Sequence, residues 1–190
     1  MKRVVITGMG GVTALGQNWE TVRAALHKNQ NAVVRIDEWS VYNGLNSLLA
    51  APAPNFTTPK HYTRKQMRSM GKVAKMATVA TEQALQQAGL LGEDILNSGD
   101  TGIAYGSSTG TPETLSGFGV MLQEKTTRCI NANTYMQMMS HTAAVNVALF
   151  FGLRGRLIPT SSACTSGSQA IGYAYESIRN GYQTVMVAGG

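Results

Sequence analysis

Residues 160–168 read Thr-Ser-Ser-Ala-Cys-Thr-Ser-Gly-Ser and separate two segments of different character. Residues 156–161 form a short segment with an apolar centre, as is typical of a buried strand. Residues 165–180 carry apolar side chains at helical spacing and are followed by Gly181. The apolar side chains that share one stripe of this helix are Ala170, Ile171, Ala174 and Ile178. The sequence therefore predicts a strand that leads directly into a helix, with Cys164 at the junction.

Cys164 is a candidate nucleophile because of this predicted position. The positive end of a helix dipole favours a thiolate over a thiol. The first backbone N–H groups of a helix have no acceptor within the helix, so they can stabilise a developing oxyanion. The small neighbouring residues leave room for a substrate carbonyl. The alternative is a buried structural cysteine, and the residues alone leave both interpretations open.

The rest of the chain predicts further strands and helices in alternation. We expect strands at residues 3–7, 101–105 and 184–188, and helices at residues 19–28, 63–88 and 136–151, in addition to the strand and helix already described. Asn18 is a suitable N-cap for the first helix, and Gly89 and Gly152 end the next two. Residues 29–60 and 111–135 have no clear period and are expected to be connections. Such alternation is typical of an α/β fold with a mostly parallel sheet.

Length and composition indicate one folded domain. The chain has 190 residues, of which 43% are hydrophobic and 14% charged, a balance that excludes a disordered protein. No apolar run is long enough to span a membrane, so we expect no membrane association. Cys129 and Cys164 are the two cysteines, and without a visible export signal we expect both to be reduced thiols in a cytoplasmic protein.

The positive charge is concentrated in residues 60–75, hereafter the basic segment. The chain has 16 Lys and Arg against 10 Asp and Glu, a net charge of +6. The basic segment contains no acid, and it accounts for the whole excess with Lys60, Arg64, Lys65, Arg68, Lys72 and Lys75. Such a patch indicates an acidic partner, although a solvated helix face is the alternative. No aromatic residues alternate with these charges, so nucleic acid is disfavoured as the partner.

Several other classes of site do not fit the sequence. Gly8-Met9-Gly10 follows the first predicted strand, but Thr13 stands where a dinucleotide-binding motif needs its third glycine. No Gly-Lys-Ser/Thr of a P-loop and no Gly-x-Ser-x-Gly of a serine hydrolase occurs. Potential metal ligands are not clustered in the sequence, so we expect no metal site.

Five stretches resemble the elongating β-ketoacyl-acyl-carrier-protein synthases of the thiolase-like superfamily. They are residues 3–10 (Arg-Val-Val-Ile-Thr-Gly-Met-Gly), 64–68 (Arg-Lys-Gln-Met-Arg), 152–155 (Gly-Leu-Arg-Gly), 163–167 (Ala-Cys-Thr-Ser-Gly) and 185–190 (Val-Met-Val-Ala-Gly-Gly). The resemblance implies thiolase-like αβαβα layers, of which residues 1–190 would be the N-terminal half of the synthase domain with a mostly parallel, mixed sheet.

The resemblance also implies a reaction. Cys164 would take an acyl group, as a thioester, from the phosphopantetheine arm of an acyl carrier protein. A malonyl-carrier protein would then lose carbon dioxide, and its carbanion would attack that thioester to give a 3-oxoacyl chain two carbons longer, as in fatty acid or polyketide elongation. The protein would bind no cofactor of its own, because the carrier protein delivers the phosphopantetheine.

Further site residues follow from the resemblance. Lys65 and Arg68 match the family's carrier-docking patch, with Arg128 a weaker candidate. Thr109 lies in the glycine-rich turn that lines the acyl pocket, and it is alternatively an ordinary loop residue. The segment with Met138 and Met139 crosses the family's dimer interface towards that pocket, and core filling is the alternative role of these methionines. His141 lies two residues after Met139, and we interpret it as a packed residue or a dimer-interface residue rather than a catalytic one.

The chain lacks the family's groups that assist decarboxylation. The two histidines and the lysine that assist decarboxylation follow the cysteine in the family, whereas His27, His61 and His141 all precede Cys164 here. We therefore expect the second half-domain to be on another polypeptide or to have been removed, and the synthase to be a homodimer or heterodimer. The alternative function is a non-catalytic, thiolase-like partner subunit that binds carrier protein without acylation of Cys164.

Overall fold

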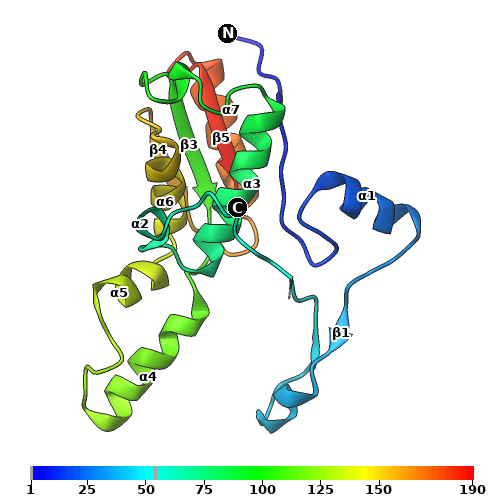
Figure 1. Ribbon diagram of the computed structural model, residues 1–190, viewed down its shortest axis with the longest axis vertical. Coiled ribbons are helices and arrows are strands. Elements are labelled where there is room, and N and C mark those ends of the chain that lie inside the picture. The colour runs from blue at the N-terminus through cyan, green and yellow to red at the C-terminus, as the bar shows by residue number, and fades with distance from the viewer. Residues whose placement is uncertain (1, 54) are drawn as a thin grey trace.

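The computed structural model, which describes residues 2–53 and 55–190, contains a parallel sheet at its centre (Figure 1). Met1, and Pro54 of the expected 29–60 connection, lie outside these residues. Within the described residues the larger sheet has three strands in the order β4 (Leu157–Thr160), β3 (Thr101–Gly106) and β5 (Val185–Gly189). Both pairings are parallel, and Ile103 of β3 is in register with Leu157 on one side and Val187 on the other. The expected parallel α/β fold is confirmed.

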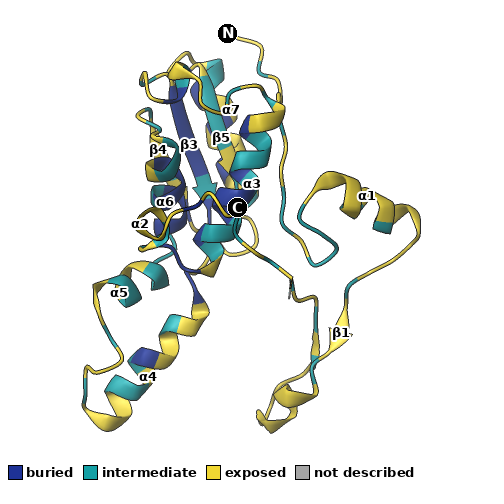
Figure 2. Cartoon of the chain, viewed as in Figure 1, coloured by how far each residue is buried: buried dark blue, intermediate teal, exposed yellow. Residues whose placement is uncertain are grey.

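Helices cover both faces of this sheet. On one face, Ile103 packs with Ala77 of α3 (Lys72–Gln87) and Val147 of α6 (Thr142–Phe151). On the other face, Ala104 packs with Ala170 and Ala174 of α7 (Ser166–Arg179). Successive residues of a strand point to opposite faces, so β3 is covered on both sides, as parallel strands usually are (Figure 2). The result is an α-β-α sandwich with β3 in its middle.

The remaining elements lie mostly outside the sandwich (Figure 1). The N-terminal elements are α1 (Trp19–His27), β1 (Val34–Arg35), the 3-10 helix η1 (Asp37–Val41) and β2 (Leu49–Ala50), with β1 and β2 paired antiparallel. Apart from the sandwich elements, the chain between β2 and β4 forms α2 (Arg64–Met67), η2 (Asp94–Leu96), η3 (Pro112–Thr114), α4 (Leu115–Glu124) and α5 (Ala132–Met138). Asn18 caps α1 as predicted, because its Oδ1 accepts a hydrogen bond from the N–H of Thr21 at 2.9 Å.

The expected opening strand at residues 3–7 is wrong. These described residues join no sheet, and Ile6 among them is 82% exposed. The segment that follows packs on α3, where the N–H of Met9 donates to Gln87 Oε1 at 2.6 Å and that of Gly11 to Gln83 Oε1 at 3.2 Å. A strand exists only where a neighbouring strand supplies backbone partners. No described strand pairs with residues 3–7, and the chain is held to α3 only after them, at Met9 and Gly11.

Two helices predicted as continuous are broken. The expected helix 63–88 is divided into α2 and α3, because Gly71 is extended and approaches Thr111 too closely for any side chain. The expected helix 136–151 is divided into α5 and α6, because Met139 is extended. The 111–135 connection contains helical structure, namely η3, α4 and the start of α5, which the sequence did not predict.

The strand and helix around Cys164 form as predicted, with one error in the helix. Three of the predicted helices were expected to end at a glycine, namely Gly89, Gly152 and Gly181, and all three glycines adopt positive φ. The inner face of α7 carries Ala170 and Ala174, but Ile171 is 58% exposed and does not belong to it.

Candidate functional site

Cys164 lies on the turn between β4 and α7, one residue before the N-cap Thr165. It is a free, exposed cysteine. Ala163, immediately before it, has a φ of +50°, in the left-handed region that non-glycine residues seldom occupy. The interpretation of Cys164 as a buried structural residue is therefore wrong for this structure, and the thiol is accessible at the start of a 14-residue helix.

Hydrogen bonds hold this turn in its left-handed conformation. The carbonyl of Ala163 accepts from the N–H and the Oγ of Ser166, at 3.1 and 2.6 Å, and from Ser108 Oγ at 3.2 Å. Ser166 Oγ also accepts from the N–H of Ser162 at 2.9 Å. Strained backbone persists where surrounding contacts determine it. Ser166, which is buried, thus fixes the orientation of the turn that presents Cys164.

The end of β3 packs closely against the first turn of α7. A Cβ at Gly106 would lie 2.5 Å from the carbonyl oxygen of Ser166 and 2.7 Å from the nitrogen of Gly167. Only glycine permits this approach of strand to helix. Gly106 therefore determines how close the start of α7, and with it Cys164, lies to the sheet.

The structure connects the Cys164 turn with two of the three predicted acyl-pocket residues. Ser108, which contacts Ala163, is followed by the exposed Thr109, and the N–H of Gly110 donates to the carbonyl of Met138 at 2.9 Å. Residues 107–110 therefore run from the Cys164 turn to the end of α5. The third predicted residue, Met139, directly follows α5 and is half-buried.

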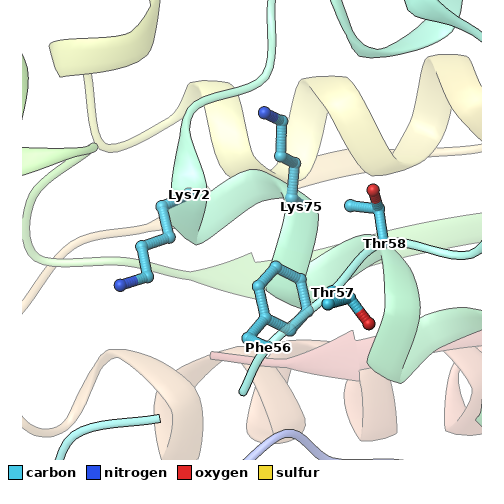
Figure 3. Close-up of a pocket in the computed structure, with 5 residues that line it drawn as sticks. All are labelled: Phe56, Thr57, Thr58, Lys72 and Lys75. Carbon is cyan, nitrogen blue, oxygen red and sulfur yellow. The ribbon is translucent and has the colours of Figure 1, made fainter. Parts of the chain in front are cut away.

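The basic segment surrounds two shallow hollows. Lys65 and Arg68 are exposed and line a hollow of about 660 Å³ that Arg64, Ser69 and Asn133 complete. Lys72 and Lys75 line a second hollow, of about 430 Å³, beside Phe56. Figure 3 shows that the ammonium groups of these two lysines point away from each other. Lys72, which is exposed, and Lys75, which is half-buried, therefore do not converge on one anion site.

The third predicted docking residue has a different environment. Arg128 Nη2 lies 2.7 Å from Glu124 Oε2, so its charge is offset by an acid four residues before it. His141, the residue interpreted as packed or at an interface, is exposed at the N-cap of α6.

Sequence reasoning missed the residues that shape the site. The sequence predicts no role for Gly106, Ser108 or Ser166, and the one available signal was the Gly-Ser pair at 106–107 directly after a predicted strand. Among the described residues, His, Cys, Asp and Glu form no group that could hold a metal ion. No helix in the described part of the chain is both long and apolar enough to cross a bilayer.

Comparisons with known proteins identify the relatives of this chain. Residues 1–190 match the family described as "Beta-ketoacyl synthase, N-terminal domain". The whole chain is 33% identical to Nodulation protein E of Rhizobium leguminosarum bv. trifolii and 32% identical to 3-oxoacyl-[acyl-carrier-protein] synthase 2 of Vibrio cholerae, and covers 46% and 45% of them. The chain thus spans about half the length of these curated relatives.

Solved structures that resemble this chain are ketosynthases, as are several of its sequence relatives. A β-ketoacyl synthase from Burkholderia phymatum STM815 superimposes with a TM-score of 0.93 and 53% identity, over 99% of this chain and 46% of that one. The ishigamide ketosynthase/chain length factor superimposes with a TM-score of 0.81 at 22% identity, which shows a shared fold alone. The thiolase-like fold expected from the sequence is confirmed.

Proposed function

From the premise that this chain belongs to the β-ketoacyl synthase family, in which it matches the N-terminal domain, we propose that it contributes the nucleophile of a condensing acyltransferase. The complete synthase would join an acyl group on Cys164 to malonyl-acyl-carrier protein and release a 3-oxoacyl-carrier protein. The second half-domain, absent from residues 1–190, would supply the remaining catalytic groups. The reaction belongs to fatty acid or polyketide elongation.

The first step is a transfer of the acyl group to the protein. The Cys164 thiolate attacks the carbonyl carbon of an acyl thioester, and a new carbon–sulfur bond forms. The tetrahedral intermediate collapses and expels the thiolate of the carrier's phosphopantetheine arm, which takes up a proton. The backbone N–H of Cys164, beside the positive end of the α7 dipole, would stabilise the oxyanion together with an amide of the second half-domain, because the N–H of Ser166 already donates to the carbonyl of Ala163.

The second step forms the carbon–carbon bond. Malonyl-carrier protein loses carbon dioxide, and the electron pair of the broken bond becomes a carbanion equivalent. That carbon attacks the Cys164 thioester, so the carbon–sulfur bond breaks and the cysteine leaves as thiolate. The product remains on the carrier as a 3-oxoacyl thioester, and the protein returns to its starting state.

The single observation that supports this proposal is the presentation of Cys164. The thiol is exposed at the N-terminus of a long helix, on a left-handed turn that Ser166 and Ser108 hold in place. A thioester carbonyl can therefore reach the sulfur without rearrangement of the turn. We assign the docking of the carrier to Lys65 and Arg68, with Arg128 secondary because Glu124 offsets its charge.

We further assign the acyl chain to the region of Thr109, Met138 and Met139. Two contacts support this assignment: Ser108 Oγ donates to the carbonyl of Ala163, next to Cys164, and the N–H of Gly110 donates to the carbonyl of Met138. The protein needs no bound cofactor in this scheme, since the phosphopantetheine arrives with the substrate.

A condensation assay with the complete synthase, including its second half-domain, tests the proposal. Acyl-carrier protein and malonyl-carrier protein labelled at the methylene carbon are supplied, and the carrier-bound product is weighed by mass spectrometry. We expect a labelled 3-oxoacyl product from the wild type and none from Cys164→Ala. Binding of carrier without any product or acylated protein would instead establish the non-catalytic partner subunit.

A further inference from the structure

The carboxylate of Glu82 on α3 binds the start of the basic segment. His61 Nε2 lies 2.7 Å from Glu82 Oε1, and the hydroxyl of Tyr62 donates to Glu82 Oε2 at 3.2 Å. An ionised carboxylate only accepts, so the imidazole Nε2 carries the hydrogen in the first contact. The Glu82 side chain is 17% exposed, whereas that of His61 is 64% exposed. Both carboxylate oxygens are therefore used to hold residues 61–62 against α3.

Tyr62 makes this attachment more rigid. It is 5% exposed, and its ring centroid lies 4.5 Å from that of Phe150 on α6. Burial, the negative charge of Glu82 and the hydrogen bond to it together raise the pKa of Tyr62. The hydroxyl thus remains a donor throughout the physiological range, and the start of the basic segment is fixed on two helices.

The basic segment has a second anchor, beyond α2. Ser69 Oγ donates to Asn146 Oδ1 of α6 at 2.7 Å. Asn146 is buried, and its amide nitrogen donates to the carbonyl of Thr142 at 2.8 Å, which orients the oxygen towards Ser69. Lys65 and Arg68 lie between this anchor and the one at Glu82, so their backbone is held from both sides.

The charge of Glu82 needs an explanation in this setting. It is the one acidic residue between Glu38 and Glu93, and it lies on the helix that carries Lys72 and Lys75. A negative charge here opposes the binding of an acidic partner through its field. Its hydrogen bonds to His61 and Tyr62 give it a geometric role that can outweigh this electrostatic cost.

We propose that Glu82 is a positioning residue for carrier docking, which holds the basic segment through His61 and Tyr62 so that Lys65 and Arg68 face the carrier in a fixed arrangement. The proposal rests on the proposed function, since it presupposes a carrier-borne substrate. It leaves the chemistry at Cys164 untouched, because Glu82 contacts neither that turn nor residues 107–110 through any hydrogen bond described above.

Kinetics with two substrates test this role in the complete synthase. Glu82→Gln and Tyr62→Phe are compared with the wild type on an acyl-carrier protein and on the same acyl group as an N-acetylcysteamine thioester, which has no acidic protein. For both variants we expect the KM for the carrier-borne substrate to rise roughly fivefold, the factor that corresponds to the loss of about one hydrogen bond. We expect kcat, and all constants with the small thioester, to stay at the wild-type values.

The direction of the change in carrier KM distinguishes a positioning role of Glu82 from a purely electrostatic one. Glu82→Gln removes a negative charge, so a purely electrostatic role would lower the KM for an acidic carrier. Glu93→Gln removes the same charge from an exposed side chain outside the basic segment and serves as the matched control. A lowered or unchanged carrier KM in Glu82→Gln, or equal losses on both substrates, would overturn the proposal. Wild-type synthase that turns over neither substrate would overturn the proposed function instead.

Discussion

At the scale of single residues, Gly106 controls the position of the candidate nucleophile. A methyl group here would collide with the backbone of Ser166 and Gly167, which cannot move without shifting the start of α7. We expect Gly106→Ala to lower the free energy of unfolding by about 1–3 kcal/mol, the usual cost of overpacking. It should also slow alkylation of Cys164, and both effects can be measured by denaturant titration and by the rate of reaction with iodoacetamide.

Gly119 provides the control for this substitution. It lies in α4, and nothing stands within 4 Å of the Cβ position. Gly119→Ala should stabilise the protein by up to about 1 kcal/mol, because alanine favours a helix over glycine. If both variants behaved alike, the close approach at Gly106 would not be the cause.

The burial of Tyr105 on β3 leads us to expect that the protein loses stability at alkaline pH. Burial raises its pKa to about 12, whereas a tyrosine in an unfolded chain ionises near pH 10. The raised value means that the fold favours the neutral form. Its contribution is therefore complete below about pH 10 and is lost as the pH rises to about 12. We expect the free energy of unfolding to fall across this range.

Tyr105→Phe isolates this contribution, because Tyr62 and the other tyrosines remain. The variant should lose less stability than the wild type between about pH 10 and 12, as measured by urea unfolding at several pH values. Parallel pH profiles for the two proteins would contradict the assignment to Tyr105.

At the scale of elements, the break between α2 and α3 depends on one contact. A Cβ at Gly71 would lie 2.6 Å from the Cβ of Thr111, with the Thr111 hydroxyl closer still. We expect Gly71→Ala to destabilise the protein by about 1–3 kcal/mol, as judged by thermal unfolding. Thr111→Gly removes the three atoms nearest to the new methyl, so the double variant should lose less than the sum of the two single changes. Strict additivity would show that the contact is not responsible.

The elements around Cys164 were predictable because their signals are local. Apolar residues 157–158 and the helical spacing after Thr165 are sufficient to indicate a strand followed by a helix, and Gly181 marks the end of α7. The candidate nucleophile was therefore placed correctly at the junction. The hydrogen bonds that shape its turn were not predictable, because Ser108 reaches Ala163 across 55 residues.

The errors have the same physical origin in long-range contacts. The helix periodicity through residues 63–88 is continuous, but Gly71 is fixed by Thr111, which is distant in sequence. The β-branched residues at 4–7 indicate a strand, yet the segment that continues from them is held by Gln83 and Gln87. The strand or helix propensity of a segment does not specify which distant part of the chain it packs against.

At the scale of the whole molecule, the charge distribution predicts how the carrier binds. The net charge of +6 comes from the basic segment, where Lys65 and Arg68 are exposed. Lys65→Glu or Arg68→Glu should raise the KM for carrier-borne substrate roughly tenfold, or about 1.4 kcal/mol. Arg128→Glu should have a smaller effect, since Glu124 already offsets Arg128.

Salt provides the independent check on this prediction. Exposed charges are screened at high ionic strength, so the wild-type KM should rise between 0.05 and about 0.5 M salt, and the charge-reversed variants should respond less. A carrier KM that ignores both salt and these substitutions would remove the basic segment from the docking surface.

The whole account depends on acylation of Cys164, which intact-mass spectrometry of the complete synthase measures directly. The protein is incubated with acyl-carrier protein alone and weighed before and after malonyl-carrier protein is added. Cys129→Ala is the matched control, because Cys129 is the other exposed free thiol in the described chain. We predict that the wild type and Cys129→Ala gain the mass of one acyl group and lose it on addition of malonyl-carrier protein, whereas Cys164→Ala gains none. An acyl adduct on Cys164→Ala that malonyl-carrier protein removes would contradict the account.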